Sequence, residues 1–183
     1  MKRRSLTSIF VAILFAPLFS PPATALVNER DSTVWGHIFA GPSSVKTYNA
    51  TTFAGAKLDA KSKFEVTYNN FPSWAQSEIQ AAVDVWAANF QSSVPIKVEA
   101  TWGRSQVYGL LGSARPGNYF NNFVSAPDPT LWYPSALANA LAGRDLDKNN
   151  PEIVIQVNSA AAWNTRNDGR PSGSEYDLQS VFI

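Results

Sequence analysis

The sequence contains no cysteine in 183 residues and a single histidine, His37. Without cysteine the chain has neither a disulfide framework nor a thiol nucleophile. One histidine cannot build a zinc site, which takes three or four protein ligands. No glycine-flanked serine elbow accompanies His37, and no phosphate-binding glycine loop is present. The residues therefore form no recognisable catalytic constellation, and a loop or packing role is favoured for His37.

A strong charge of either sign is also lacking. Removal of the first 25 residues takes Lys2, Arg3 and Arg4 from the 15 basic residues, which leaves 12 against 14 acidic ones. A nearly neutral surface has no electrostatic footprint for nucleic acid or for an anionic membrane, so neither is expected as a partner. Nothing in the sequence indicates an oligomeric state.

The N-terminal apolar run, residues 9–19, is too short for a membrane span, which takes about 20 apolar residues. It follows three basic residues and precedes the small-residue site Ala23-Thr24-Ala25. This pattern is typical of a signal peptide over residues 1–25 and predicts secretion, either to the periplasm or out of the cell. An uncleaved N-terminal anchor is the alternative.

Residues 26–62 show no clear periodicity, and we interpret them as an N-terminal extension of the domain. Within it, four apolar residues predict either a short strand or a patch that docks on the main body: Val34, Trp35, Ile38 and Phe39. Regular architecture is expected to begin at Lys63.

A βαβ unit is predicted for residues 64–102. Apolar and polar residues alternate over 64–68 and again over 96–102, as in strands with one buried face. Between them, Ser73 and Gln76 form a capping-box pair at the start of a helix. Strand, helix and strand within about 40 residues predict a right-handed, parallel unit. The helix carries an apolar stripe typical of core packing, formed by Ile79, Ala82, Val83, Trp86 and Phe90.

Shorter elements are expected between residues 103 and 158. Residues 110–114 predict a strand, and the glycines Gly109 and Gly112 indicate an edge or bulged position. Ser135 to Ala142 predicts a helix, and the apolar run 152–157 fits a central strand buried on both faces. The loops between them are rich in aromatic residues and are as consistent with a binding role as with a structural one.

Asp145, Asp147 and Asn149 alternate like the oxygen ligands of a calcium loop. The sixth position of this loop lacks glycine, and Gln156 stands where a bidentate glutamate is expected. A solvated turn is the favoured interpretation, with calcium binding as the alternative. Such carboxylate pairs are also too common to indicate glycoside hydrolysis.

The last ten residues, 174–183, predict the opening of a buried helix. Ser174 or Asp177 can cap it. Its apolar face consists of Leu178, Val181 and Phe182. No glycine and no basic last turn follows, so we expect the sequence to stop inside this helix.

Several separate segments resemble the N-terminal part of a metzincin-type catalytic domain, and more narrowly a group of exported bacterial matrixin-like zinc proteases. These segments are 64–68, 81–86, 94–98, 111–114, 132–134, 136–143 and 176–183. The resemblance covers residues 63–183. It implies an α/β (α+β) fold, with a mixed twisted sheet, a right-handed βαβ unit and a truncated active-site helix in an incomplete domain.

In that family the final helix continues into His-Glu-x-x-His-x-x-Gly-x-x-His, whose histidines hold zinc and whose glutamate acts as general base. The resemblance implies zinc as the cofactor and a peptide or protein as the substrate of the complete enzyme. The motif is not in this sequence, so we expect no catalytic residue, no metal ligand and no cofactor in this chain.

The family also has an edge strand that lines the cleft and pairs with an extended peptide substrate through its backbone. Leu111, Gly112, Ser113 and Ala114 match the position of this strand and are the expected substrate-binding residues. The resemblance thus implies that the chain is the exported N-terminal portion of a zinc endopeptidase, inactive alone. The alternative is a secreted, non-catalytic module that binds carbohydrate or peptide through exposed aromatic side chains.

Overall fold

The computed structural model describes residues 27–40 and 60–183. The predicted signal peptide lies outside the described residues. The elements in chain order are β1 (Asn28–Asp31), β2 (Gly36–Phe39), β3 (Phe64–Asn69), α1 (Ser73–Asn89), β4 (Ile96–Gly103), β5 (Leu110–Pro116), β6 (Asn118–Asn121), β7 (Tyr133–Pro134), α2 (Ser135–Ala142), β8 (Ile153–Asn158) and α3 (Leu178–Phe182).

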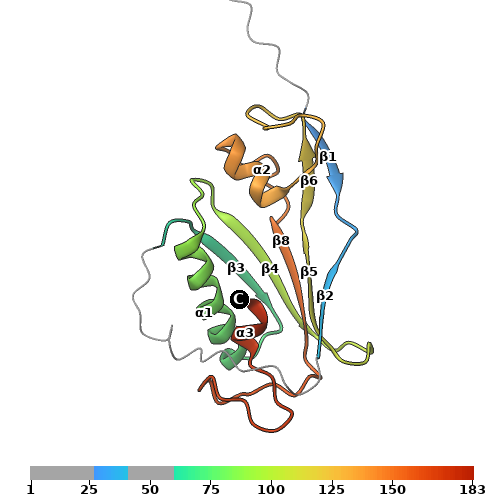
Figure 1. The fold of residues 1–183 in the computed structure, drawn as a ribbon, viewed down its shortest axis with the longest axis vertical. Helices are drawn as coiled ribbons and strands as arrows, with labels where there is room; N and C mark the ends of the chain where they lie inside the picture. Colours follow the sequence, from blue (N-terminus) through green and yellow to red (C-terminus); the bar gives the residue numbers. More distant parts are fainter. Residues whose placement is uncertain (1–26, 41–59) are drawn as a thin grey trace, which may run out of the picture.

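The strands form two sheets, and the described chain has a mixed α+β fold. The larger sheet has the order β2-β5-β8-β4-β3, and the smaller has the order β1-β6-β7. β3, β4 and β8 are parallel, whereas β5 runs antiparallel to both β8 and β2. Figure 1 shows α1 and α3 together beside β3 and β4, whereas α2 lies at the opposite end, near β6.

The parallel β3–α1–β4 unit is confirmed, but its predicted capping box is wrong. Pro72 takes the N-cap position, and no side chain caps the helix. Ser73 is therefore already inside the first turn. The Gln76 amide instead donates to the Phe71 carbonyl at 3.1 Å, which fixes the chain that enters the helix.

The main core lies between α1, α3 and the larger sheet. Ile79 on α1, Ala100 on β4, Val157 on β8 and Leu178 on α3 are each at most 1% exposed. A second cluster joins the smaller sheet to α2 through Phe120, Phe123 and Ala138. The end of the predicted α1 stripe does not reach the core, because Phe90 follows the last helical residue and is 52% exposed.

Regular structure begins before Lys63, contrary to expectation. The short strand that was one of two predictions for Val34, Trp35, Ile38 and Phe39 is confirmed in part, because β2 contains Ile38 and Phe39. β1 pairs with β6 of the smaller sheet, and β2 pairs with β5 of the larger one, both antiparallel. The part of the N-terminal extension that the structure describes therefore supplies an outer strand to each sheet. In Figure 1 these two strands follow one another along the same side of the molecule as β6 and β5.

The predicted strand near residue 155 exists as β8 and lies centrally in its sheet. Burial on both faces was wrong, because Ile153, Val154 and Ile155 are only half-buried and Gln156 is exposed. α2 matches its prediction and ends at Gly143, whose φ of 65° is the left-handed conformation that glycine adopts readily.

Candidate functional site

The four predicted substrate-binding residues lie together on β5. Leu111, Gly112 and Ser113 are buried, and Ala114 is exposed. On one side β5 pairs with β8, with Gly112 opposite Val157 and Ala114 opposite Ile155. Their backbone positions are thus fixed by a strand that belongs to the core of the sheet.

Of the two predicted positions for β5, the edge is wrong, because β2 pairs with its other side. The bulged position is confirmed, because the register with β2 skips Leu111 between Gly112 and Leu110. Gly36 lies opposite Ala114, His37 opposite Ser113 and Ile38 opposite Gly112. All four residues of β2 are exposed, so the strand shows no alternation between buried and exposed positions that a sequence pattern would reveal. The family role of residues 111–114 stays a prediction.

The Phe182 ring of the helix α3 lies close to Gly112 of β5, whereas the helix packs mainly on α1. A Cβ atom added at Gly112 would lie 3.7 Å from Phe182 Cζ and 3.0 Å from the Gln156 carbonyl oxygen. Glycine at this position therefore permits the close approach of the Gln156 carbonyl of β8, and the Phe182 ring lies at an ordinary contact distance from this glycine. From the other side, the Trp86 indole donates a hydrogen bond of 2.8 Å to the Phe182 carbonyl, which ties α3 to α1.

Asp177 caps α3, as one of the two predicted candidates. Its carboxylate accepts a hydrogen bond from the backbone N–H of Ser180 at 2.9 Å. Leu178 begins the helix and is completely buried in the main core. The short helix is therefore held by its cap, by its first side chain and by the Trp86 contact.

An acidic group that the sequence analysis missed lies where α1 meets the start of α3. Glu78 is on α1 and is 7% exposed. Burial, followed by the charges of Asp177 and Asp168, raises its pKa to about 7. Glu78 lies three residues after Ala75 and one before Ile79, which places it on the apolar stripe of the helix. This spacing is the sequence signal that could have predicted its burial.

A buried polar cluster joins β4 to α2. Glu152 is 2% exposed, and its carboxylate accepts hydrogen bonds from the Lys97 backbone N–H at 2.6 Å and the Asn139 amide at 3.0 Å. The Lys97 ammonium lies 2.9 Å from Asp145, and this hydrogen bond raises the pKa of Lys97. These partners satisfy the carboxylate of Glu152 internally, which indicates a structural role.

The calcium-like loop is a hydrogen-bonded turn. Asp145 accepts from the backbone N–H of Asp147 at 3.0 Å, and Asp147 accepts from the N–H of Asn149 at 2.9 Å. The second oxygen of Asp147 accepts from the amides of Asn150 at 2.6 Å and Asn118 at 3.0 Å. The two aspartates are half-buried, so the loop is less solvated than expected.

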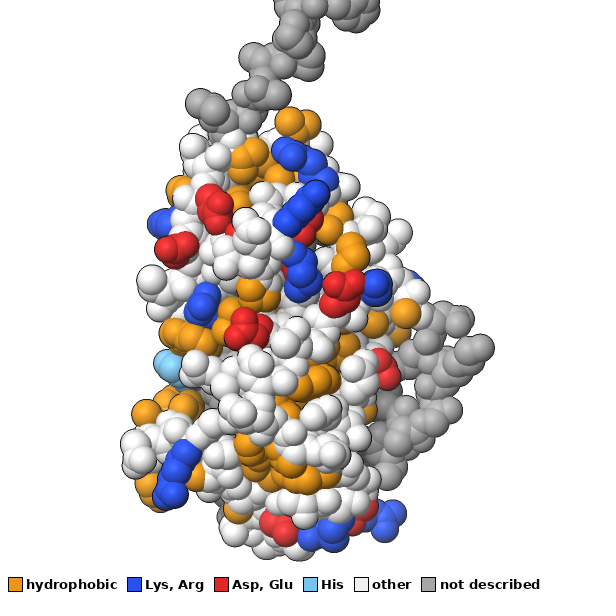
Figure 2. Space-filling model, turned by 180° about the vertical axis from the view of Figure 1, so that it is seen from behind, with side chains coloured by type: hydrophobic (Ala, Val, Ile, Leu, Met, Phe, Trp, Pro, Cys, Tyr) orange, Lys and Arg blue, Asp and Glu red, His pale blue; other side chains and the backbone are white. Residues whose placement is uncertain are grey.

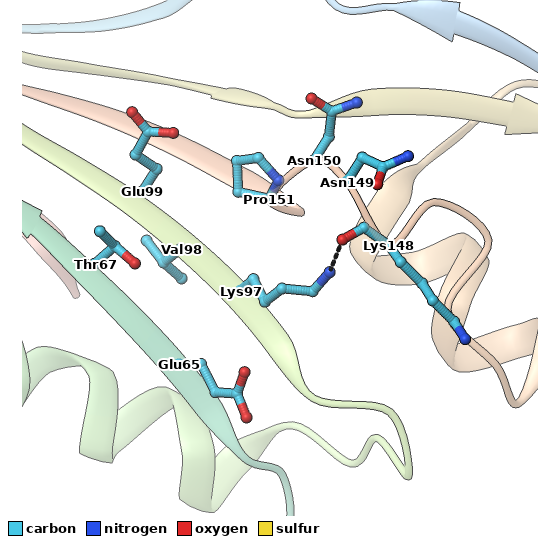
Figure 3. A pocket seen from close by; sticks show the side chains of 9 residues that line it. All are labelled: Glu65, Thr67, Lys97, Val98, Glu99, Lys148, Asn149, Asn150 and Pro151. Atoms are coloured by element: carbon cyan, nitrogen blue, oxygen red, sulfur yellow. Dashed lines mark hydrogen bonds between the residues drawn. The ribbon is translucent and has the colours of Figure 1, made fainter.

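A shallow polar cavity of about 250 Å³ lies beside β3 and β4. Figure 3 shows Glu65 of β3 and Glu99 of β4 apart from each other on its wall, and Lys97 extended toward the loop that carries Lys148. Lys97 donates to the Lys148 carbonyl at 3.2 Å. The residues of β5 do not contribute to this cavity, so it is separate from the predicted peptide-binding strand.

Within residues 27–40 and 60–183, no group of three or more His, Cys, Asp and Glu side chains is arranged to hold a metal ion. His37 is exposed on β2. The described residues therefore do not fit a catalytic zinc ion.

None of the helices described has both the length and the hydropathy that crossing a bilayer requires.

The face shown in Figure 2 carries basic and acidic side chains intermixed over its upper half, and apolar side chains are exposed below them.

No protein-family model, no curated protein and no solved structure matches this chain. The family resemblance therefore stays a prediction, and the contact between α3 and β5 is the structural feature that bears on function.

Proposed function

We propose that residues 63–183 form the peptide-binding side of a zinc-dependent metalloendopeptidase domain of the metzincin type. The observation that carries the proposal is the contact of α3 with β5. A capped helix with a buried first residue brings the Phe182 ring close to the strand that resembles the family's substrate-binding strand. In the family, the helix at this place leads into the zinc-binding motif.

The mixed sheet supports the same proposal. Three parallel strands place β8 at the centre, and an antiparallel β5 lies between it and the outer strand. In the family, an extended peptide binds such a strand by backbone hydrogen bonds, which hold it without selecting its sequence strongly. In this structure β2 occupies that side of residues 111–114. We also propose that residues 1–25 act as a signal peptide that directs secretion.

The proposal requires that the zinc ligands and the general base come from sequence outside these 183 residues. Reading the transcript through codon 183 and beyond tests this requirement. A His-Glu-x-x-His pattern in any frame directly downstream is the expected result. If no frame encodes it, the protease proposal fails.

The purified 183-residue chain provides a biochemical test of the same assignment. We expect no stoichiometric zinc by elemental analysis and no cleavage of a quenched fluorescent peptide library, because the described residues include no ligand group. Bound zinc together with chelator-sensitive cleavage would show that the ligands had been assigned to the wrong place.

One observation favours a second candidate, a secreted binding module. Tyr108 is 99% exposed, and Trp132 is 37% exposed with the Arg30 guanidinium 4.8 Å from its ring centre. Exposed aromatic rings are suited to stacking on sugars or peptides. Pull-down on insoluble polysaccharides with the wild-type chain and with Tyr108→Ala would detect this activity.

A further inference from the structure

We propose that β2 is an exchangeable internal ligand of β5, and that an extended peptide binds β5 antiparallel by taking the place of β2. The inference rests on the proposed use of β5 as a peptide-binding strand. It adds what occupies that strand in the free protein and what the incoming peptide has to displace.

The first argument is the way β2 is held. Its four residues are exposed, and the side chains of Ile38 and Phe39 are 44% and 52% exposed and belong to neither core cluster. The pairing register also shifts between these two residues. β2 is therefore attached to the sheet mainly through its backbone, which is the interaction that any extended peptide can reproduce.

The second argument is the chain that leads into β2. Ser32 is 6% exposed, and its hydroxyl has no hydrogen-bond partner among the described residues. A buried hydroxyl without a partner weakens the segment that contains it. Trp35 anchors this connection on the other side, with the Arg115 guanidinium 5.1 Å from its ring centre. β2 can thus separate from β5 beyond an anchored Trp35.

The third argument is that β5 remains in place without β2. Its other side stays paired with β8 from Gly112 to Pro116, and Leu111 is buried in the main core. Departure of β2 would expose a row of free backbone N–H and C=O groups on β5. Such an open strand edge is a template for an incoming extended chain.

The register between β2 and β5 also predicts which peptides fit. Residues directly opposite one another in a β-ladder point to the same face of the sheet. The peptide residue that replaces Ile38 would face Gly112, on the side where Phe182 lies. An apolar residue is expected at this position, because the absent side chain of Gly112 leaves the Phe182 ring as the neighbouring surface.

The test uses a disulfide that fixes β2 to β5. The chain has no native cysteine, and Gly36 lies directly opposite Ala114 in the ladder, so Gly36→Cys with Ala114→Cys introduces a single cross-link between exposed positions. The probe is a fluorescein-labelled peptide of residues 34–40, Val-Trp-Gly-His-Ile-Phe-Ala, whose binding to the full chain is read by fluorescence anisotropy.

Oxidation of the double-cysteine chain should abolish binding of the probe, and reduction should restore it. Two variants loosen β2: Ala40→Pro removes the hydrogen bond of 2.7 Å from the Ala40 N–H to the Gly109 carbonyl, and Ile38→Gly weakens the strand itself. Either should tighten binding about tenfold, because apparent affinity scales with the fraction of open molecules.

The control peptide has the same sequence with N-methyl groups on the alternate amides that would point toward β5, which removes its donors to that strand, and it should not bind. The inference is overturned if the oxidised chain binds the probe as tightly as the reduced one, if neither loosened variant gains affinity, or if the N-methylated peptide binds equally well. The assay requires neither zinc nor cleavage. A negative result would therefore contradict the exchange of β2 without contradicting the protease proposal, which the downstream sequence and the zinc measurement test separately.

Discussion

Glu78 is the side chain whose charge the fold opposes most clearly. It is nearly buried on α1, and burial, Asp177 and Asp168 together raise its pKa from 4.5 to about 7. The folded state therefore binds a proton at this site more tightly than the unfolded state does. The stability that this protonation contributes is complete below the unfolded pKa and is lost as the pH rises through about 7.

Glu78→Gln should remove this part of the pH dependence. We expect the variant to unfold at higher urea concentration than the wild type at pH 8, with a gain of roughly 1–3 kcal/mol, because a neutral amide avoids the burial of a charge. At pH 4 the two proteins should differ little. Glu65→Gln, the same change at an exposed position, is the control. An equal gain from both variants would contradict the assignment.

The roles of individual acidic side chains were only partly predictable from the sequence. Asp177 was recognisable as a cap because it precedes an apolar helical pattern. Glu78 was recognisable in principle, since it interrupts an apolar stripe. Glu152 was not, because its partners Lys97 and Asn139 are 55 and 13 residues away and no local pattern encodes such a contact.

Among the secondary-structure elements, the contact between α3 and β5 supports the functional proposal most directly. Gly112→Ala should strain the pairing of β5 with β8 and disturb the Phe182 contact, because the new Cβ would lie 3.0 Å from the Gln156 carbonyl oxygen and 3.7 Å from Phe182 Cζ. We expect a loss of about 1–3 kcal/mol in the free energy of unfolding. Gly103→Ala is the matched control, since a Cβ there meets nothing within 4 Å.

Urea unfolding followed by tryptophan fluorescence measures both glycine variants. Trp86 donates to the Phe182 carbonyl, so the native emission spectrum of the Gly112 variant should also change. If the two variants are equally stable and their spectra match, Gly112 is not needed for the packing of α3.

Elements with an amphipathic pattern were predictable in type and bounds. Of those without one, β1 was missed and β2 was predicted only as one of two alternatives. β3, β4 and α1 each bury one face, so the periodicity of apolar residues indicated their type and approximate bounds. β1 and β2 are short and exposed along their whole length, and their pairing depends on backbone groups of distant strands. For the same reason the sequence left β5 as either an edge or a bulged strand, and only the bulge is present, because β2 covers the edge.

In the molecule as a whole, two apolar clusters are joined by a polar connection. The main core and the cluster beneath the smaller sheet are built from separate sets of residues. Glu152 precedes β8 of the larger sheet, and its carboxylate connects Lys97 of β4 to Asn139 of α2. The Ser135 hydroxyl at the start of α2 also donates to the Glu152 carbonyl at 2.9 Å.

Glu152→Gln should therefore loosen the smaller sheet and α2 from the rest of the domain. Both carboxylate oxygens accept hydrogen bonds from N–H donors, so the glutamine NH₂ group must face one of those donors. We expect a loss of roughly 1–3 kcal/mol in the free energy of unfolding, with faster amide hydrogen exchange in β6 and α2 than in β4. Glu99→Gln on β4 makes the same change where the carboxylate accepts a single amide bond of 3.2 Å from Asn69, and it should change exchange little. Uniform acceleration across both sheets would mean that the domain opens as one unit and that Glu152 does not hold a separable part.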